Sequence, residues 1–214
     1  LDKAQTVVSL GNDFMMNGRD HLRLTREFNE ARKVFVKKGD DKALADTSMN
    51  RLYAIEAGFS LTGSNADHRY RLQASAMFEF LVALTREISK LTKIDDRLKN
   101  YLEGFSAKYN FAGDKLQKGE AAKTGADFIS ALAKELVDNS KNGKGSAILA
   151  GDSQPVAVHA LALLLNEALG NTGKSLTFSE RAAKYNENSI EALRTSIEEG
   201  KVKDLIILNG NPAF

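Results

Sequence analysis

Short apolar runs, each followed by a turn, recur along the chain. They cover residues 6–10, 51–56, 146–150, 175–178 and 204–208. Runs of this length and composition are typical of strands buried in a parallel sheet. The pattern therefore predicts strands at these places.

Apolar residues recur at helical intervals in the middle of the chain. The members of the longest stripe are Met77, Phe80, Leu81, Leu84, Ile88 and Leu91. A single apolar stripe of this kind predicts a helix over residues 73–92. Similar stripes predict a shorter helix near 98–105 and another over 126–137, with a polar linker or loop at 115–120.

From residue 144 onward, the predicted strands and helices alternate. The segment 155–169 is apolar on almost every face, which predicts a buried helix. A second helix is expected to begin at Asn188 or Ser189 and to end at Gly200. The apolar residues that this second helix would bury are Ile190, Leu193 and Ile197. The resulting strand–helix–strand–helix–strand order has Rossmann-like spacing, and its crossovers are expected to be right-handed.

The predicted fold class is α/β: a Rossmann-like parallel sheet with flanking helices, plus a helical middle segment. We expect a first α/β part over residues 1–72, a helical segment over 73–143 and a Rossmann-like part over 144–214. Only a short loop follows the last predicted strand, and the first strand has no preceding partner. This pattern predicts that the chain is an internal piece of a larger protein.

The segment over residues 19–38 is rich in Arg and Lys. Two interpretations stay open: a solvated, mostly helical face, or a surface that binds phosphates or a partner. No aromatic residues interleave with these charges in the way that nucleic-acid binding requires, so nucleic acid is not a predicted partner. The following residues, 39–48, are expected to form a loop.

Composition excludes several kinds of chemistry. The chain has 214 residues, a net charge of +2, no cysteine and only three histidines, which are far apart. Disulfides, thiolate metal sites and cysteine nucleophiles are therefore excluded within it, and a histidine metal cluster is not expected. The longest apolar stretch is much shorter than the roughly 20 residues of a membrane span, so direct membrane insertion is not predicted.

Two turns stand out as candidate ligand contacts. Each follows a predicted strand, at the edge where open α/β sheets bind ligands. The first precedes a helix N-terminus, where unpaired amides and the helix dipole favour an anion. The residues of the two turns are Gly151, Asp152, Ser153, Gln154, Asn209, Gly210 and Asn211. The alternative is an ordinary turn whose helix is capped by Asp152 or Ser153.

No catalytic group emerges from the residues alone. Asp67 and His68 are neighbours in sequence, but no candidate nucleophile pairs with them at a recognisable spacing. A structural role, in which Asp67 closes a turn, is the expected one. No catalytic residue and no metal ligand are predicted.

Several segments together resemble a known family. They are Met49-Asn50-Arg51-Leu52-Tyr53-Ala54-Ile55-Glu56, Leu61-Thr62-Gly63, Ala66-Asp67-His68-Arg69, Gly151-x-x-Gln154-Pro155-x-x-Val158-His159-Ala160-Leu161, Leu169-Gly170-Asn171-x-Gly173-Lys174 and Ile207-Leu208-x-Gly210-Asn211-Pro212. This run of motifs is similar to the molybdopterin-oxidoreductase-like subunits of alternative complex III, a quinol-oxidising complex. By fold, that family belongs with the large molybdenum enzymes of the dimethyl-sulfoxide-reductase type.

The resemblance implies a much longer protein with iron–sulfur clusters outside this segment, on the periplasmic face of the cytoplasmic membrane. It implies partners among the other subunits of a respiratory complex. It also implies that the seven turn residues occupy the place of contacts to a pterin guanine dinucleotide. Arg71 stands where cofactor-bearing relatives carry a proline, and the complex III subunits have an emptied molybdopterin domain, so the resemblance points away from a bound pterin.

Three hypotheses follow. In the first, the chain is a non-catalytic structural segment of such a subunit, with no cofactor of its own. In the second, it is part of an active molybdenum-pterin oxidoreductase that binds the dinucleotide. In the third, it is a stand-alone nucleotide-binding α/β domain.

Overall fold

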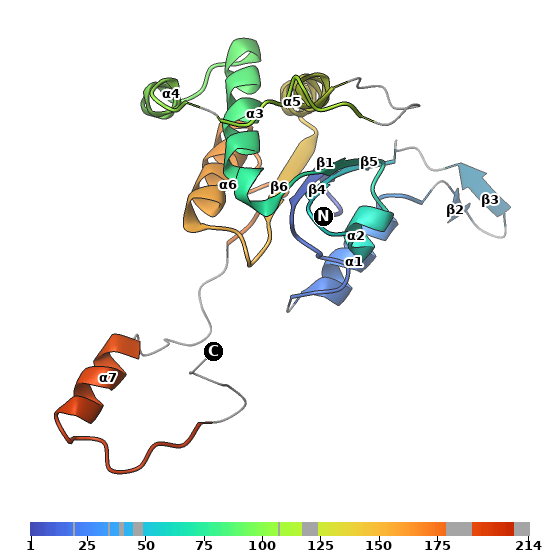
Figure 1. Cartoon of the computed structure of the whole chain (residues 1–214). Helices are drawn as coiled ribbons and strands as arrows, with labels where there is room; N and C mark the ends of the chain where they lie inside the picture. The colour runs from blue at the N-terminus through green and yellow to red at the C-terminus, as the bar shows by residue number, and fades with distance from the viewer. Residues whose placement is uncertain are drawn as a thin grey trace. The chain divides into compact units, whose positions relative to one another are not determined.

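The computed structural model of this chain describes residues 1–18, 20–33, 35–38, 41–44, 49–106, 108–116, 124–178 and 190–207 (Figure 1). It forms two compact units, Leu1–Thr177 and Phe178–Phe214. The first unit contains the sheet and most of the helices. In the second, the described residues form one helix, α7 (Ile190–Glu198), and residues 199–207 after it form neither helix nor strand.

The first unit is built on a four-stranded parallel sheet. Its strands are β1 (Ala4–Leu10), β4 (Arg51–Glu56), β5 (His68–Arg71) and β6 (Gly145–Ala150). They lie in the order β5-β4-β1-β6, and each neighbouring pair is parallel. The chain moves outward from β1 to β5 and then returns to the opposite side of β1, which is the order of a Rossmann-like sheet. The predicted α/β fold class is confirmed.

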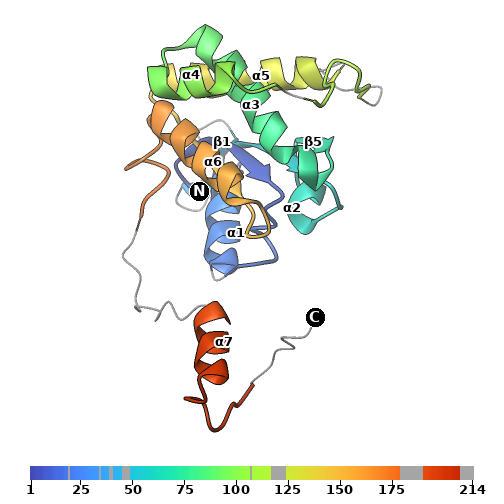
Figure 2. The same cartoon turned by 60° about the vertical axis from the view of Figure 1, so that its left-hand side comes forward.

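Helices cover both faces of the sheet (Figure 1). On one face lie α3 (Met77–Leu91), α5 (Gly125–Lys141) and α6 (Val156–Ala168); α3 packs against both of the others (Figure 2). On the other face lie α1 (His21–Glu30) and the short α2 (Leu61–Ser64). Side chains alternate along β1, so that Val8 and Leu10 join the core under α3, α5 and α6 while Val7 joins the core under α1.

The remaining elements are short. They are the antiparallel pair β2 (Phe35–Lys38) and β3 (Asp41–Leu44), the 3-10 turn η1 (Ala74–Ala76) and helix α4 (Asp96–Glu103). The hairpin overlaps residues that the sequence analysis assigned partly to a helical face and partly to a loop. That assignment was wrong for residues 35–38 and 41–44, whereas α1 confirms a helix in the charged segment.

Two predicted strands do not form. Residues 175–178 contain only an isolated bridge from Leu176 to Thr172, and residues 204–207 form no strand. Leu205, Ile206 and Ile207 are 51–81% exposed rather than buried, and Leu208 lies outside the described residues. Of the predicted strand–helix–strand–helix–strand order, the first strand and both helices form, as β6, α6 and α7, whereas the second strand and the described part of the third do not.

The expected burial of two helices is also corrected. α7 buries none of its described residues, and its apolar positions Ile190, Leu193 and Ile197 are exposed. α6 buries one face only, because Leu163 and Leu164 are nearly half exposed. An apolar stripe predicts which face of a helix prefers burial, but it does not supply the surface that covers that face.

The edge of β6 explains why no further strand follows it in the sheet. Asn166 imitates a neighbouring strand: its Oδ1 accepts from the N–H of Ile148 at 3.0 Å and its Nδ2 donates to the Ile148 carbonyl at 2.9 Å. Two residues further back on the strand, Asn171 Oδ1 accepts from the Ser146 N–H at 3.0 Å, and the Ser175 hydroxyl donates to the Ser146 carbonyl. These side chains occupy the positions that an added strand would need.

Candidate functional site

The carboxyl edge of the sheet is the candidate site, since open α/β sheets bind their ligands there. The loops after β1, β4, β5 and β6 meet at this edge. The topological switch point lies between β1 and β6, because the chain leaves β1 on one side and later returns on the other. A dinucleotide in the usual binding mode would lie at this point.

At the switch point the two turns touch each other. Gly11 follows β1 with a φ of +59°, and Gly151 follows β6 and donates its N–H to the Leu10 carbonyl at 3.0 Å. A Cβ atom placed on Gly151 would lie 2.0 Å from the carbonyl oxygen of Gly11. Only glycine fits at residue 151, and the reason is contact with the chain itself.

The side chain of Gln154 packs over the Gly11 turn. Gln154 is only 9% exposed, and its Nε2 would lie 2.7 Å from a Cβ placed on Gly11. Its Oε1 is buried and accepts no hydrogen bond from any described residue, which costs free energy. The amide therefore fills space between the turns of β1 and β6 that a ligand would otherwise use.

Helix α6 begins beside these turns without a side-chain cap. Pro155 is the capping residue and makes no side-chain hydrogen bond to the helix. Asp152 and Ser153 are exposed, and neither caps the helix, so that sequence-based alternative was wrong. The free amides favour an anion, but the carboxylate of Asp152 places negative charge at the same end.

The predicted ligand turns thus have different outcomes. Gly151, Asp152, Ser153 and Gln154 do lie at the carboxyl edge, as expected. Asn209, Gly210 and Asn211 lie outside the described residues. The structure instead places the turn after β1 against Gly151.

Polar side chains of the turn after β1 bond to the protein. Asn12 donates from Nδ2 to the Ala150 carbonyl at 3.1 Å and so ties the two turns together. Asp13 accepts from the backbone N–H and the hydroxyl of Thr62, at 2.9 and 2.8 Å. Neither residue was predicted from the sequence to belong to the site, although Gly-Asn-Asp directly after a buried strand was a usable signal.

The carboxylate of Glu56, at the end of β4, also forms its hydrogen bonds within the protein. In a dinucleotide-binding sheet an acidic residue near this position binds the ribose hydroxyls. Here Glu56 is buried, accepts from Arg69 Nε at 2.6 Å and accepts from the Ser60 hydroxyl at 2.5 Å. Its charge is therefore neutralised within the protein.

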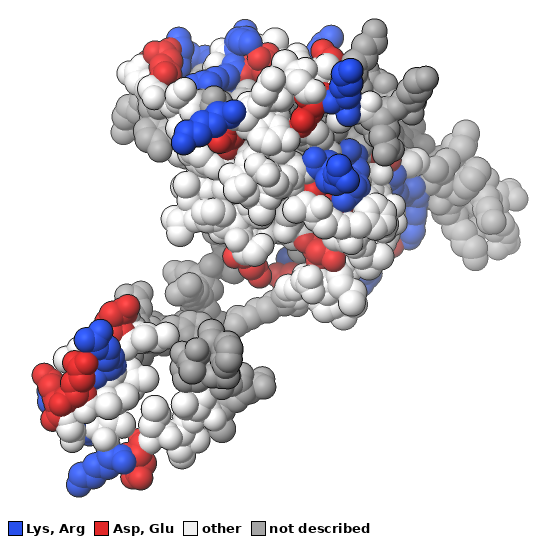
Figure 3. Space-filling view, in the orientation of Figure 1, with Lys and Arg blue, Asp and Glu red and all other residues white. Residues whose placement is uncertain are grey.

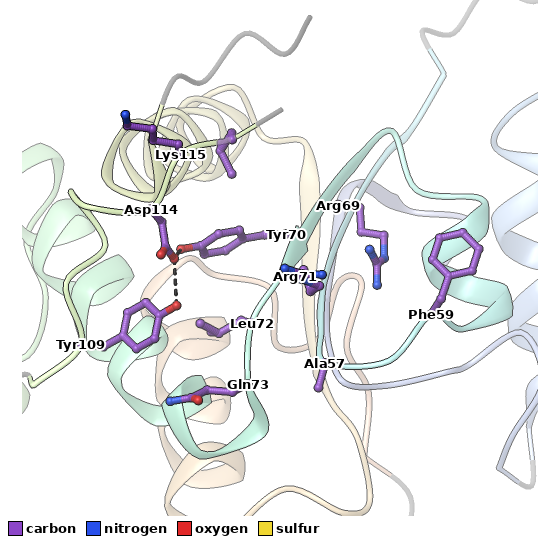
Figure 4. A pocket seen from close by; sticks show the side chains of 11 residues that line it. Ala57, Phe59, Arg69, Tyr70, Arg71, Leu72, Gln73, Tyr109, Asp114 and Lys115 are labelled. Carbon is purple, nitrogen blue, oxygen red and sulfur yellow. Dashed lines mark hydrogen bonds between the residues drawn. The ribbon is translucent and has the colours of Figure 1, made fainter. Parts of the chain in front are cut away.

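A cavity of about 780 Å³ lies beside β5. Figure 4 shows Tyr109 and Asp114 on one side of it, Arg69 and Phe59 on the other, and Arg71 between them. The hydroxyls of Tyr70 and Tyr109 both donate to Oδ2 of Asp114. Burial, followed by this carboxylate, raises the pKa of both phenols, so both stay protonated and donating at neutral pH.

The cavity beside β5 was not predicted from the sequence. Its walls come from the ends of β4 and β5 and from a loop about forty residues later, and only the fold brings these segments together. The charged sequence of β5 also concealed its identity as a strand, because an edge strand needs no apolar run.

Asp67 has a structural role, as expected, but it links two distant segments of the chain rather than closing a turn. Its carboxylate pairs with the Arg32 guanidinium, at 2.7 and 2.8 Å, and accepts from the Leu52 N–H at 2.8 Å. Burial alone would raise the pKa of Asp67, but these hydrogen bonds outweigh it and hold the pKa below its usual value.

The described cations of the 19–38 segment are largely paired. Arg23 contacts Asp20 and Glu27, and Lys33 contacts Glu30. Figure 3 shows charges of both signs interspersed on the visible face of the Leu1–Thr177 unit. These pairs favour a solvated face over a phosphate-binding surface.

Within the described ranges, no three His, Cys, Asp or Glu side chains come together in a way that would hold a metal ion. None of the helices in those ranges combines the length and apolar character needed to cross a bilayer.

Comparison with known proteins adds no family assignment: no family model matches this sequence, and no curated protein matches it significantly.

Proposed function

We propose that this chain is a non-catalytic α/β segment of a molybdopterin-oxidoreductase-like subunit in a membrane-associated respiratory complex that oxidises quinol. Its role is structural: it presents a rigid Rossmann-like sheet that holds an iron–sulfur domain of the same protein against neighbouring subunits. The protein would lie on the periplasmic face of the cytoplasmic membrane. The family, the complex and the location rest on the sequence motifs that resemble alternative complex III.

The closed switch point is the observation that supports a structural role. Gly151 contacts Gly11 directly, and Gln154 covers the Gly11 turn. Glu56 is engaged by Arg69 and Ser60. A pyrophosphate needs open backbone amides and space at this point, and a ribose needs a free acid. The residues present therefore do not fit a pterin guanine dinucleotide at the switch point.

The alternative is a segment of an active molybdenum-pterin oxidoreductase. The uncapped start of α6 and the unpartnered Oε1 of Gln154 favour it, because both offer polar groups that a ligand would satisfy. For this alternative to hold, Gln154 would have to swing away from Gly11 when the ligand enters.

The two readings differ in metal content. We would purify the protein from its own host and measure molybdenum, iron and the fluorescence of oxidised pterin. The proposal predicts iron without stoichiometric molybdenum or pterin. One molybdenum and a matching amount of pterin per chain would refute the structural role and support the alternative.

A further inference from the structure

The two edges of the sheet differ in how their backbone groups are satisfied. On β6, the outward groups of Ser146 and Ile148 bond to Asn166, Asn171 and Ser175. This edge is closed to any further strand, because an added strand would need the same donors and acceptors.

The outer edge of β5 is open. Tyr70 pairs with Ile55, and the Leu72 N–H donates to the Glu56 carbonyl at 3.0 Å. In a parallel ladder the backbone groups of alternate residues point the same way, so Arg69 and Arg71 direct their N–H and C=O groups outward. No described residue forms a hydrogen bond with these outward groups.

The cavity of about 780 Å³ lies directly against this open edge. Arg71 and Lys115 line it, and neither forms an ion pair with a described carboxylate. The two acids nearby are already engaged: Glu56 by Arg69, and Asp114 by the two tyrosine hydroxyls (Figure 4). The space beside β5 therefore combines unpaired backbone groups with uncompensated positive charge.

We propose that the outer edge of β5 is a docking edge, on which an extended acidic segment of a partner protein adds as a fifth strand. This inference rests on the proposed structural function and names the surface through which the segment meets a partner. A peptide backbone supplies alternating donors and acceptors that match Arg69 and Arg71, and its carboxylates match the side chains of Arg71 and Lys115.

The charges on β5 make the edge selective. Arginines on an edge strand discourage pairing with neutral or basic strands, which limits aggregation. An acidic strand is attracted by these arginines instead of being repelled. It gains both the hydrogen bonds of the sheet and ion pairs. A small anion would satisfy the guanidinium of Arg71 but would leave the outward carbonyls of β5 without donors.

The test uses the whole chain and a synthetic probe. The probe is a capped hexapeptide in which Glu and Thr alternate; the matched control peptide carries Lys in place of Glu. We expect the acidic peptide to bind and to slow hydrogen exchange at the amides of Arg69 and Arg71. The Tyr70 amide, which already donates to β4, should not change. The basic peptide should not bind.

Two variants make the test specific. Arg71→Glu should weaken binding of the acidic peptide by about tenfold or more, as loss of a close charge pair does. Lys174→Glu changes an exposed cation in the turn after α6 by the same two charges, and it should leave binding unchanged.

Three results would overturn the proposal: no binding of the acidic peptide, binding that does not slow exchange at Arg69 and Arg71, or full competition by inorganic phosphate. The last would mark the cavity as a simple anion site. None of these results depends on molybdenum content, so the docking edge and the structural function can fail separately.

Discussion

Single residues close the switch point, and Gly151 has the tightest contact there. Replacing Gly151 with alanine would place a methyl group 2.0 Å from the Gly11 carbonyl oxygen, which neither turn can accommodate without moving. We expect Gly151→Ala to lower the free energy of unfolding by about 1–3 kcal/mol, as overpacking does. Urea denaturation measures the change.

Gly58 provides the matched control, because no described atom outside its own neighbourhood lies within 4 Å of its Cβ position and its φ is not positive. Gly58→Ala should change stability by less than about 0.5 kcal/mol. Equal effects of the two substitutions would show that the turns are not in close contact.

Asp67 gives the fold a predictable dependence on pH. Its folded pKa is lowered, so the stability that it contributes is present above its unfolded pKa of about 3.9 and is lost as the pH falls through the folded pKa. The free energy of unfolding should therefore fall as the pH is lowered below about 4. Asp67→Asn should be less stable than the parent at pH 7, and the difference should shrink in acid.

The comparison variant for this experiment is Asp204→Asn, because Asp204 is exposed, lies outside any helix and has no ion pair within the described part of the chain. Its acid dependence should match that of the parent. If Asp67→Asn also kept the full acid dependence, the Arg32–Asp67 pair would not contribute to it.

Among the elements, β6 depends on the side chain of Asn166, which forms hydrogen bonds with its outer backbone groups. Asn166→Ala would leave the N–H and C=O of Ile148 without their partners in a buried place. Each lost partner of a buried polar group costs about 1–3 kcal/mol, so we expect a loss of stability of at least about 2 kcal/mol. An opened edge should also promote association between chains, which analytical ultracentrifugation would detect.

Asn142→Ala is a suitable reference for Asn166→Ala, since Asn142 is exposed at the end of α5 and its side chain forms no hydrogen bond with a strand in the described part of the chain. It should remain monomeric and nearly as stable as the parent. An Asn166→Ala variant with unchanged stability and association would contradict the proposed role of the amide.

Some of the helices and strands could be predicted from the sequence and others could not. β1, β4, β6 and the long helices α3 and α5 follow from their apolar patterns, because burial in this sheet or under it is what those patterns favour. β5 was missed because an edge strand with arginines has no apolar run. The predicted strand is absent from the described residues 204–207, because an apolar run forms a strand only where a neighbouring strand offers free backbone groups.

For the whole molecule, the fold class could be predicted from the sequence. Whether the switch point is open to a ligand or filled by the protein could not. The alternation of strands and helices indicated a Rossmann-like sheet and placed Gly151 at its ligand edge. Nothing in the sequence indicated that Gly11 and Gln154 would fill the space beside Gly151, because residues 11 and 154 meet only after the sheet assembles. The cavity beside β5 depends on long-range assembly in the same way.

The molecule contains a sheet whose usual ligand crevice is closed by its own residues and whose outer edge at β5 is open. This combination supports the proposed structural role over the binding of a dinucleotide. It also explains why Glu56, Asp13 and Asn12 all bond within the protein.

The most direct test of the closed crevice is a titration of the chain with GDP, which carries the guanine, ribose and pyrophosphate of the dinucleotide. Backbone amide resonances of Gly11, Gly151 and Gln154 would report binding at the switch point. We expect no saturable shift of these resonances at millimolar GDP. A saturable shift confined to these three amides would contradict this expectation and would show that Gln154 yields to a ligand.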